Sequence, residues 1–179
     1  MVKKLLVLIC SVVLLAACGN APTKEASNNS EAVAVYKNAS ALTHHMEGVK
    51  LEIDYEVKEV TGKAEKMNGI TLQSGDYLLE VTGKVLNDFE RTIYYTPKFN
   101  VQSDSQVQFE EIASSVEVEQ LELEPTTKET FTVTYVIPKK YYDQFSSLNI
   151  TIPAAFSEPN SVSSGDALGD STTLEMPIK

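Results

Sequence analysis

Residues 49–58 alternate apolar and charged side chains without interruption. The apolar positions are Val49, Leu51, Ile53, Tyr55 and Val57, and the charged positions are Lys50, Glu52, Asp54, Glu56 and Lys58. A period of two places all the apolar side chains on one face of an extended strand, whereas a helix would distribute them around its axis. A strand with one apolar face is typical of an antiparallel sheet that covers a core on one side. The pattern therefore predicts a long, half-buried strand that ends at Thr61-Gly62.

Shorter patterns of the same kind predict further strands at residues 76–86, 92–95, 99–101, 107–109, 116–123, 131–137, 148–152 and 174–178. Gly83 suggests a bulge or the close approach of another backbone within the first of these. The compact helical candidate is residues 139–145. Because parallel strands need long crossovers, usually helices, the sequence predicts an all-β fold, an antiparallel immunoglobulin-like β-sandwich of about seven to eight strands. Its expected core contains Leu51, Ile53, Leu79, Val81, Val133, Tyr135, Ile150 and Ile152.

The chain begins with features of an export signal. Lys3 and Lys4 precede a largely apolar run at residues 5–15, which closes at Ala16-Ala17-Cys18. The run is too short to span a bilayer comfortably, so we interpret residues 1–17 as a removable signal peptide. The junction resembles the lipobox of bacterial lipoproteins. This resemblance implies that Cys18 is the first residue of the mature protein and carries a diacylglycerol anchor, which would hold the chain on the extracytoplasmic face of the cell membrane.

Residues 18–45 are interpreted as the lipidated cysteine followed by a disordered, flexible tether, and residues 46–179 as the sandwich domain. Residues 19–30 are small and polar and have little to bury. Residues 31–42 are rich in Ala and Val and are compatible with a transient helix.

Charge and cysteine content exclude several classes of function. Two of the fifteen basic residues and none of the twenty-five acidic residues precede Cys18, so the mature chain carries a formal net charge of −12. Nucleic acid would be repelled, and a charged partner should be a basic protein or polymer. Cys10 leaves with the signal and Cys18 would carry the lipid, so no disulfide or thiolate zinc site is expected. We also expect no cofactor or metal, because there is no calcium-binding loop and adjacent His44 and His45 would point to opposite faces of a strand.

Three segments resemble a known group of domains. They are residues 76–87, a long strand that ends in Asn87, residues 121–125, and residues 131–138. Together they are similar to the telokin-like, immunoglobulin-type domains of unknown function on lipoproteins of Gram-positive bacteria. The resemblance covers about residues 46–153 and implies a sandwich at the cell surface. It carries no catalytic residue to transfer.

Two groups of residues are candidates for binding. Glu117, Glu119, Glu122 and Glu124 alternate with apolar residues and could form a carboxylate face for a cation or a basic partner. Alternatively, they are the solvated side of a strand, charged to prevent edge-to-edge pairing. Tyr94 and Tyr141 belong to tyrosine doublets in which one member should face outward. Such tyrosines favour binding surfaces, but they also pack at the rim of a core.

The sequence contains no Gly-x-Ser-x-Gly, His-Glu-x-x-His or phosphate-loop motif. We therefore expect a non-enzymatic binding or interaction module of the cell envelope. The alternatives are an envelope enzyme or enzyme accessory that uses surface carboxylates, and a passive envelope component without a specific ligand.

Overall fold

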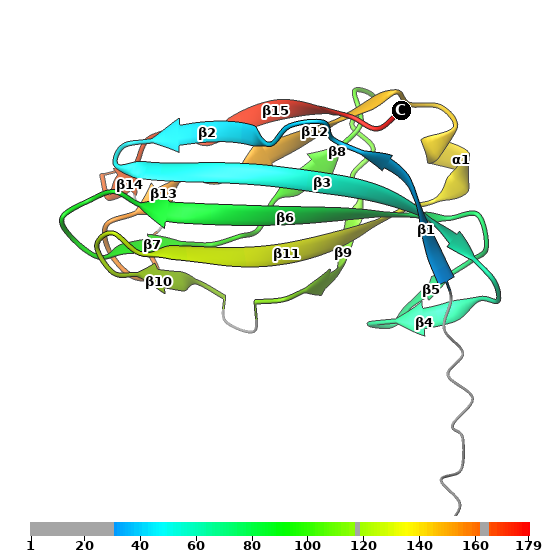
Figure 1. Cartoon of the computed structure of the whole chain (residues 1–179), viewed down its shortest axis with the longest axis horizontal. Coiled ribbons are helices and arrows are strands. Elements are labelled where there is room, and N and C mark those ends of the chain that lie inside the picture. The colour runs from blue at the N-terminus through cyan, green and yellow to red at the C-terminus, as the bar shows by residue number, and fades with distance from the viewer. Residues whose placement is uncertain (1–30, 117–118, 162–164) are drawn as a thin grey trace, which may run out of the picture.

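The computed structural model describes residues 31–116, 119–161 and 165–179. Its largest sheet contains β1 (Glu31–Lys37), β2 (Leu42–Met46), β3 (Val49–Thr61), β6 (Tyr77–Asn87), β11 (Lys128–Ile137) and β9 (Glu110–Ser114). Figure 1 shows β3, β6 and β11 as long neighbouring strands across the width of the molecule. Every pair in this sheet is antiparallel. The predicted fold class, an all-β antiparallel sandwich, is confirmed.

Two smaller sheets lie behind the large one (Figure 1). The first contains β10 (Leu121–Leu123), β7 (Ile93–Tyr95), β13 (Ala155–Phe156) and β14 (Ala167–Leu168). The second contains β15 (Thr172–Pro177), β12 (Ser147–Ile152) and β8 (Asn100–Gln102). One continuous hydrophobic core joins these sheets to the large sheet. All eight predicted core residues lie in it and are at most 1% exposed, as alternation along the strands requires.

The described residues form fifteen strand segments, more than the seven to eight predicted. Breaks in the pattern separate strands that belong to different sheets. Residues on either side of buried Pro97, for example, form β7 and β8, because proline cannot donate to a ladder. The expected strand at 107–109 is only a bridge between Gln102 and Gln108. The predicted helix is limited to α1 (Lys139–Tyr142).

A satellite core lies on the outer face of the large sheet. The hairpin of β4 (Glu65–Met67) and β5 (Ile70–Leu72) contributes Leu72 to it. Val60, Ile112 and Val136 complete its buried part. At the tip of the hairpin, Asn68 and Gly69 both have positive φ, 47° and 88°, as a tight two-residue turn requires. The side-chain amide of Asn68 donates a hydrogen bond to the backbone carbonyl of Ile112.

The domain begins earlier than predicted. Both β1 and β2 pair with β3, so residues 31–37 and 42–46 belong to the sheet and are neither tether nor helix. Pairing with the long β3 compensates for the weak strand propensity of the alanines in this segment. Asn38 links the two short strands: its Oδ1 accepts from the Tyr55 amide at 2.8 Å and its Nδ2 donates to the Ser40 carbonyl at 2.8 Å. The predicted signal peptide, Cys18 and the first part of the tether lie outside the described residues.

Candidate functional site

An aromatic and acidic surface covers the outer face of the β10–β7–β13–β14 sheet. Tyr94 lies at its centre, in register with Glu122 on β10 and Phe156 on β13. Its neighbours in sequence, Ile93 and Tyr95, point inward and are fully buried. Residues in register share a face of the sheet, so Glu122, Tyr94 and Phe156 form one row on the outside. We call these three residues the Tyr94 row.

Carboxylates surround the phenol of Tyr94. Loss of hydration raises its pKa, and the negative charges of Glu122, Glu158 and Glu124 raise it further. Glu122, Glu124 and Glu158 are all exposed, and Glu124 Oε2 also accepts a hydrogen bond of 3.4 Å from the Thr92 hydroxyl. Aromatic rings flanked by carboxylates suit an ammonium or guanidinium group, which is attracted both to the ring face and to the anions.

A buried asparagine positions the carboxylate side of this surface. Asn87, at the end of β6, is fully buried. Its Nδ2 lies within hydrogen-bonding distance of the Arg91, Leu123 and Glu124 carbonyls, at 2.9, 3.0 and 3.1 Å, and its Oδ1 accepts from the Phe89 amide at 2.8 Å. These bonds hold the end of β10, with Glu122 in the strand and Glu124 directly after it, against the large sheet.

The structure divides the predicted carboxylate face. Glu122 and Glu124 lie beside Tyr94, but Glu119 lines a cleft, and Glu117 falls outside the described residues. Because β10 covers only Leu121–Leu123, Glu119 is not part of the strand that carries Glu122. Of the predicted glutamates, the described structure therefore brings Glu122 and Glu124 together beside Tyr94, and the prediction for Glu117 stays untested.

Tyr141 belongs to another part of the molecule. It lies on α1, at the end of the sandwich opposite β10 and β13 (Figure 1). Its ring packs edge-on against Phe109, with centroids 6.1 Å apart, and stacks on Phe145 at 6.4 Å. Lys140 Nζ lies 4.6 Å from the centre of the ring. These contacts are those of rim packing, the alternative given for the tyrosine doublets.

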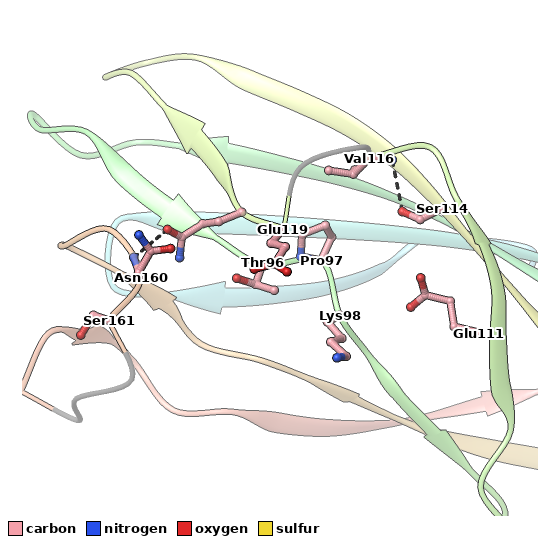
Figure 2. Close-up of a pocket in the computed structure, with 10 residues that line it drawn as sticks. Thr96, Pro97, Lys98, Glu111, Ser114, Val116, Glu119, Asn160 and Ser161 are labelled. Atoms are coloured by element: carbon pink, nitrogen blue, oxygen red, sulfur yellow. Dashed lines mark hydrogen bonds between the residues drawn. The ribbon is translucent and has the colours of Figure 1, made fainter.

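The cleft that contains Glu119 has a volume of about 600 Å³. Figure 2 shows Lys98, Glu111 and Glu119 around it, with Thr96 and Asn160 nearby. Gln120 Oε1 accepts from the Asn160 backbone amide at 2.9 Å, which ties the loop after β13 to the segment before β10. The cleft combines one ammonium group with two carboxylates and suits a small polar molecule.

Sequence patterns did not reveal Phe156, Glu158, Lys98 or Glu111 as site residues. Phe156 and Glu158 lie at the start of a segment without any periodic pattern of apolar and polar residues. Glu111 and Lys98 are isolated charged residues that belong to no motif. The register of β13 with β7 is what brings Phe156 to Tyr94.

His44 on β2 is only partly exposed. Its Nε2 is buried and has no hydrogen-bond partner, and burial lowers the pKa of the ring. Within the described ranges, no group of three His, Cys, Asp or Glu side chains is arranged to hold a metal ion. No helix in this part of the chain is long and apolar enough to cross a membrane.

Several solved structures share this fold. A functionally unknown protein from Listeria monocytogenes EGD-e superposes with a TM-score of 0.63 at 12% identity, over 84% of this chain and 89% of that one. The YjhA protein of Bacillus subtilis superposes with a TM-score of 0.53 at 17% identity, over 77% of this chain and 97% of that one. YcdA of Bacillus subtilis is described as a candidate lipoprotein. It superposes with a TM-score of 0.52 at 12% identity, over 77% of this chain and 39% of that one.

No protein of curated function matches this sequence. Residues 20–179 match the family described as Domain of unknown function (DUF5068), and the chain therefore belongs to that family.

Proposed function

We propose that this protein is a membrane-anchored lipoprotein of the cell envelope, whose immunoglobulin-type sandwich binds a cationic partner without catalysis. The observation that carries the binding role is the Tyr94 row. Tyr94 and Phe156 offer adjacent aromatic side chains, and Glu122, Glu124 and Glu158 supply negative charge around Tyr94. The partner would be a basic protein or polymer outside the membrane.

The anchoring half of the proposal rests on the junction Leu15-Ala16-Ala17-Cys18 and the basic flank at Lys3 and Lys4. Only twelve residues would separate a lipid-bearing Cys18 from the first described residue, Glu31. A segment of this length reaches about 20 Å as a flexible coil, so the domain would stay close to the membrane surface while remaining free to rotate. YcdA, which shares the fold and is described as a candidate lipoprotein, is consistent with this location.

The acidic surface also fits the whole-chain charge. A mature charge of −12 steers cations toward the protein over a range set by the Debye length, about 10 Å at 0.1 M salt. The Tyr94 row then supplies short-range contacts that a general negative field lacks. Exposed cation–π contacts contribute about 0.5–1 kcal/mol each, and exposed ion pairs about 0.2–1 kcal/mol.

A fluorescent oligolysine peptide serves as the probe for this surface, with binding to the full chain followed by anisotropy at low salt. The double variant Glu122→Gln/Glu124→Gln should weaken binding about three- to tenfold. The variant Tyr94→Leu should weaken it about threefold. Both effects should shrink as salt rises to physiological strength.

The matched control is Glu110→Gln/Glu129→Gln, which removes the same charge from two exposed positions on β9 and β11. Equal weakening by the two double variants would mean that only net charge matters, and the assignment of the site to the Tyr94 row would fail. Turnover of a defined substrate, abolished by one carboxylate substitution, would replace the binding module with the enzyme alternative.

A further inference from the structure

The cleft that contains Lys98, Glu111 and Glu119 lies where three parts of the chain meet, and we call it the Lys98 cleft. Its walls are β9, the link between β7 and β8, and the two segments that precede β10 and follow β13 (Figure 2). Its volume of about 600 Å³ is within the range of cavities that hold small ligands. No residue of the Tyr94 row lines it, so it is a separate site.

A β-bulge in β9 turns two polar side chains into this cleft. Val133 and Tyr135 on β11 point into the core, and they lie in register with Ser114 and Glu111. Ile112 is an extra residue in β9 that has no partner on β11. Residues three positions apart in a regular strand point to opposite faces, so the bulge is what allows Glu111 and Ser114 to share the inner face.

A tight turn positions the wall that carries Lys98. The Lys98 amide donates to the Thr96 carbonyl at 2.8 Å, which closes a three-residue turn around the buried Pro97. The hydroxyl of the buried Tyr135 donates to the Phe99 carbonyl at 3.1 Å, which ties the residue after Lys98 to β11. The backbone on both sides of Lys98 is therefore held in place.

The charged groups of the cleft are left unpaired. Lysines on the outer face of the large sheet, such as Lys58 and Lys84, form ion pairs with glutamates at 3.0 and 3.1 Å. In contrast, the described residues place no opposite charge within 4 Å of Lys98 Nζ or of the Glu111 and Glu119 carboxylates. Figure 2 shows the two carboxylates on different walls. A ligand that carries charges of both signs would bridge these groups.

We propose that the Lys98 cleft binds a small diamino acid, a molecule with two ammonium groups and one carboxylate. The carboxylate of the ligand accepts hydrogen bonds from Lys98, and its two ammonium groups donate to Glu111 and Glu119. Because one lysine and two glutamates line the cleft, a ligand with a net charge of +1 balances it. A zwitterion with a single ammonium group leaves one carboxylate unpaired, and a diamine leaves Lys98 unpaired.

Isothermal titration calorimetry of the full chain, at low salt and pH 7, tests this charge requirement with three related molecules. L-Lysine carries all three charged groups, norleucine lacks the side-chain ammonium group, and cadaverine lacks the carboxylate. L-Lysine should bind at least about threefold more tightly than either of the other two.

Substitutions locate the site. Lys98→Met should weaken the binding of L-lysine by about threefold or more and should abolish its advantage over cadaverine. Glu111→Gln and Glu119→Gln should each weaken L-lysine binding by a similar factor. The matched controls are Lys128→Met and Glu110→Gln, which make the same changes of charge at exposed positions outside the cleft. Glu110 is next to Glu111 on β9 and pairs with Val136 of the outer satellite core, so the two carboxylates lie on opposite faces.

The proposal is overturned if the unmodified chain gives no heat of binding at millimolar L-lysine, or binds cadaverine equally well. It is also overturned if Glu110→Gln weakens binding as much as Glu111→Gln. The variant Glu122→Gln/Glu124→Gln should bind L-lysine as the unmodified chain does, and a loss confined to that variant would place L-lysine on the Tyr94 row instead. All the substituted side chains are exposed, so loss of binding would not reflect unfolding, and circular dichroism checks this.

Discussion

Gly83 on β6 lies directly opposite Phe131 on β11, and the Phe131 ring occupies the space that a side chain at Gly83 would fill. A Cβ atom at Gly83 would lie 2.1 Å from Cζ of that ring, far inside van der Waals contact. The ladder between the two strands continues through this pair without a shift of register. The glycine therefore marks neither a bulge nor the close approach of another backbone. It leaves the space that the Phe131 ring occupies in the core.

Replacing Gly83 with Ala should destabilise the domain by about 1–3 kcal/mol, because the Phe131 ring must move within a packed core. Phe131 also lies near Phe99, with ring centroids 5.8 Å apart, so the displacement would spread. Urea unfolding followed by circular dichroism measures the change. In the background of Phe131→Leu the same glycine substitution should cost much less. Equal costs in the two backgrounds would contradict the contact.

Asn87 should be intolerant of substitution, since its side chain joins β6 to the end of β10. Asn87→Ala leaves three backbone carbonyls and one amide without this partner and should cost about 2–3 kcal/mol. Asn87→Asp should cost more at neutral pH, because a carboxylate would face those carbonyl oxygens. Thermal unfolding at pH 7 ranks the variants. An Asn87→Asp protein as stable as the original would show that these bonds do not hold β10.

Stability should fall as the pH drops below about 6.5, through the protonation of His44. Burial lowers the pKa of this ring in the folded state, and the neighbouring His45 lowers it further, against a hydrogen bond to the Asp170 backbone that raises it. The unfolded chain therefore binds the proton more readily, so protonation favours unfolding, while above the unfolded pKa the penalty is absent.

Melting temperatures at pH 7.5 and 5.5 measure this effect. The variant His44→Leu should flatten the difference between the two pH values, whereas His45→Gln, at an exposed position, should leave most of it. If His44→Leu retains the full acid sensitivity, other groups must cause it.

Cys18→Ala should release the protein from the membrane, because one thiol carries the proposed anchor. Fractionation of cells after a high-salt wash measures this, with Cys10→Ala as the matched control, since residue 10 lies in the segment that should be removed. Persistence of the Cys18→Ala chain in the washed membranes would exclude lipidation as the means of attachment.

Alternation predicted the long strands because they are half-buried by one core. Residues such as Ile53, Leu79 and Val133 are buried for the reason the pattern indicates. The pattern failed where pairing, not burial, decides the structure. Ala32 and Val33 are both exposed and show no alternation of apolar and polar side chains, yet they pair with β3 in the sheet. Long-range register likewise brought Phe156 to Tyr94, across more than sixty residues of sequence.

Both edges of the large sheet are irregular. At β9, the pairing with β11 shifts register at Ile112, and the β4–β5 hairpin binds the carbonyl of that residue through Asn68. At β1, the pairing with β3 shifts register between Ala34 and Tyr36. An interrupted edge of this kind is a poor template for another strand. A sheet with two regular open edges could add copies indefinitely and form fibres. The two irregularities, at Val35 and Ile112, therefore protect the long sheet from growth by further copies at either side.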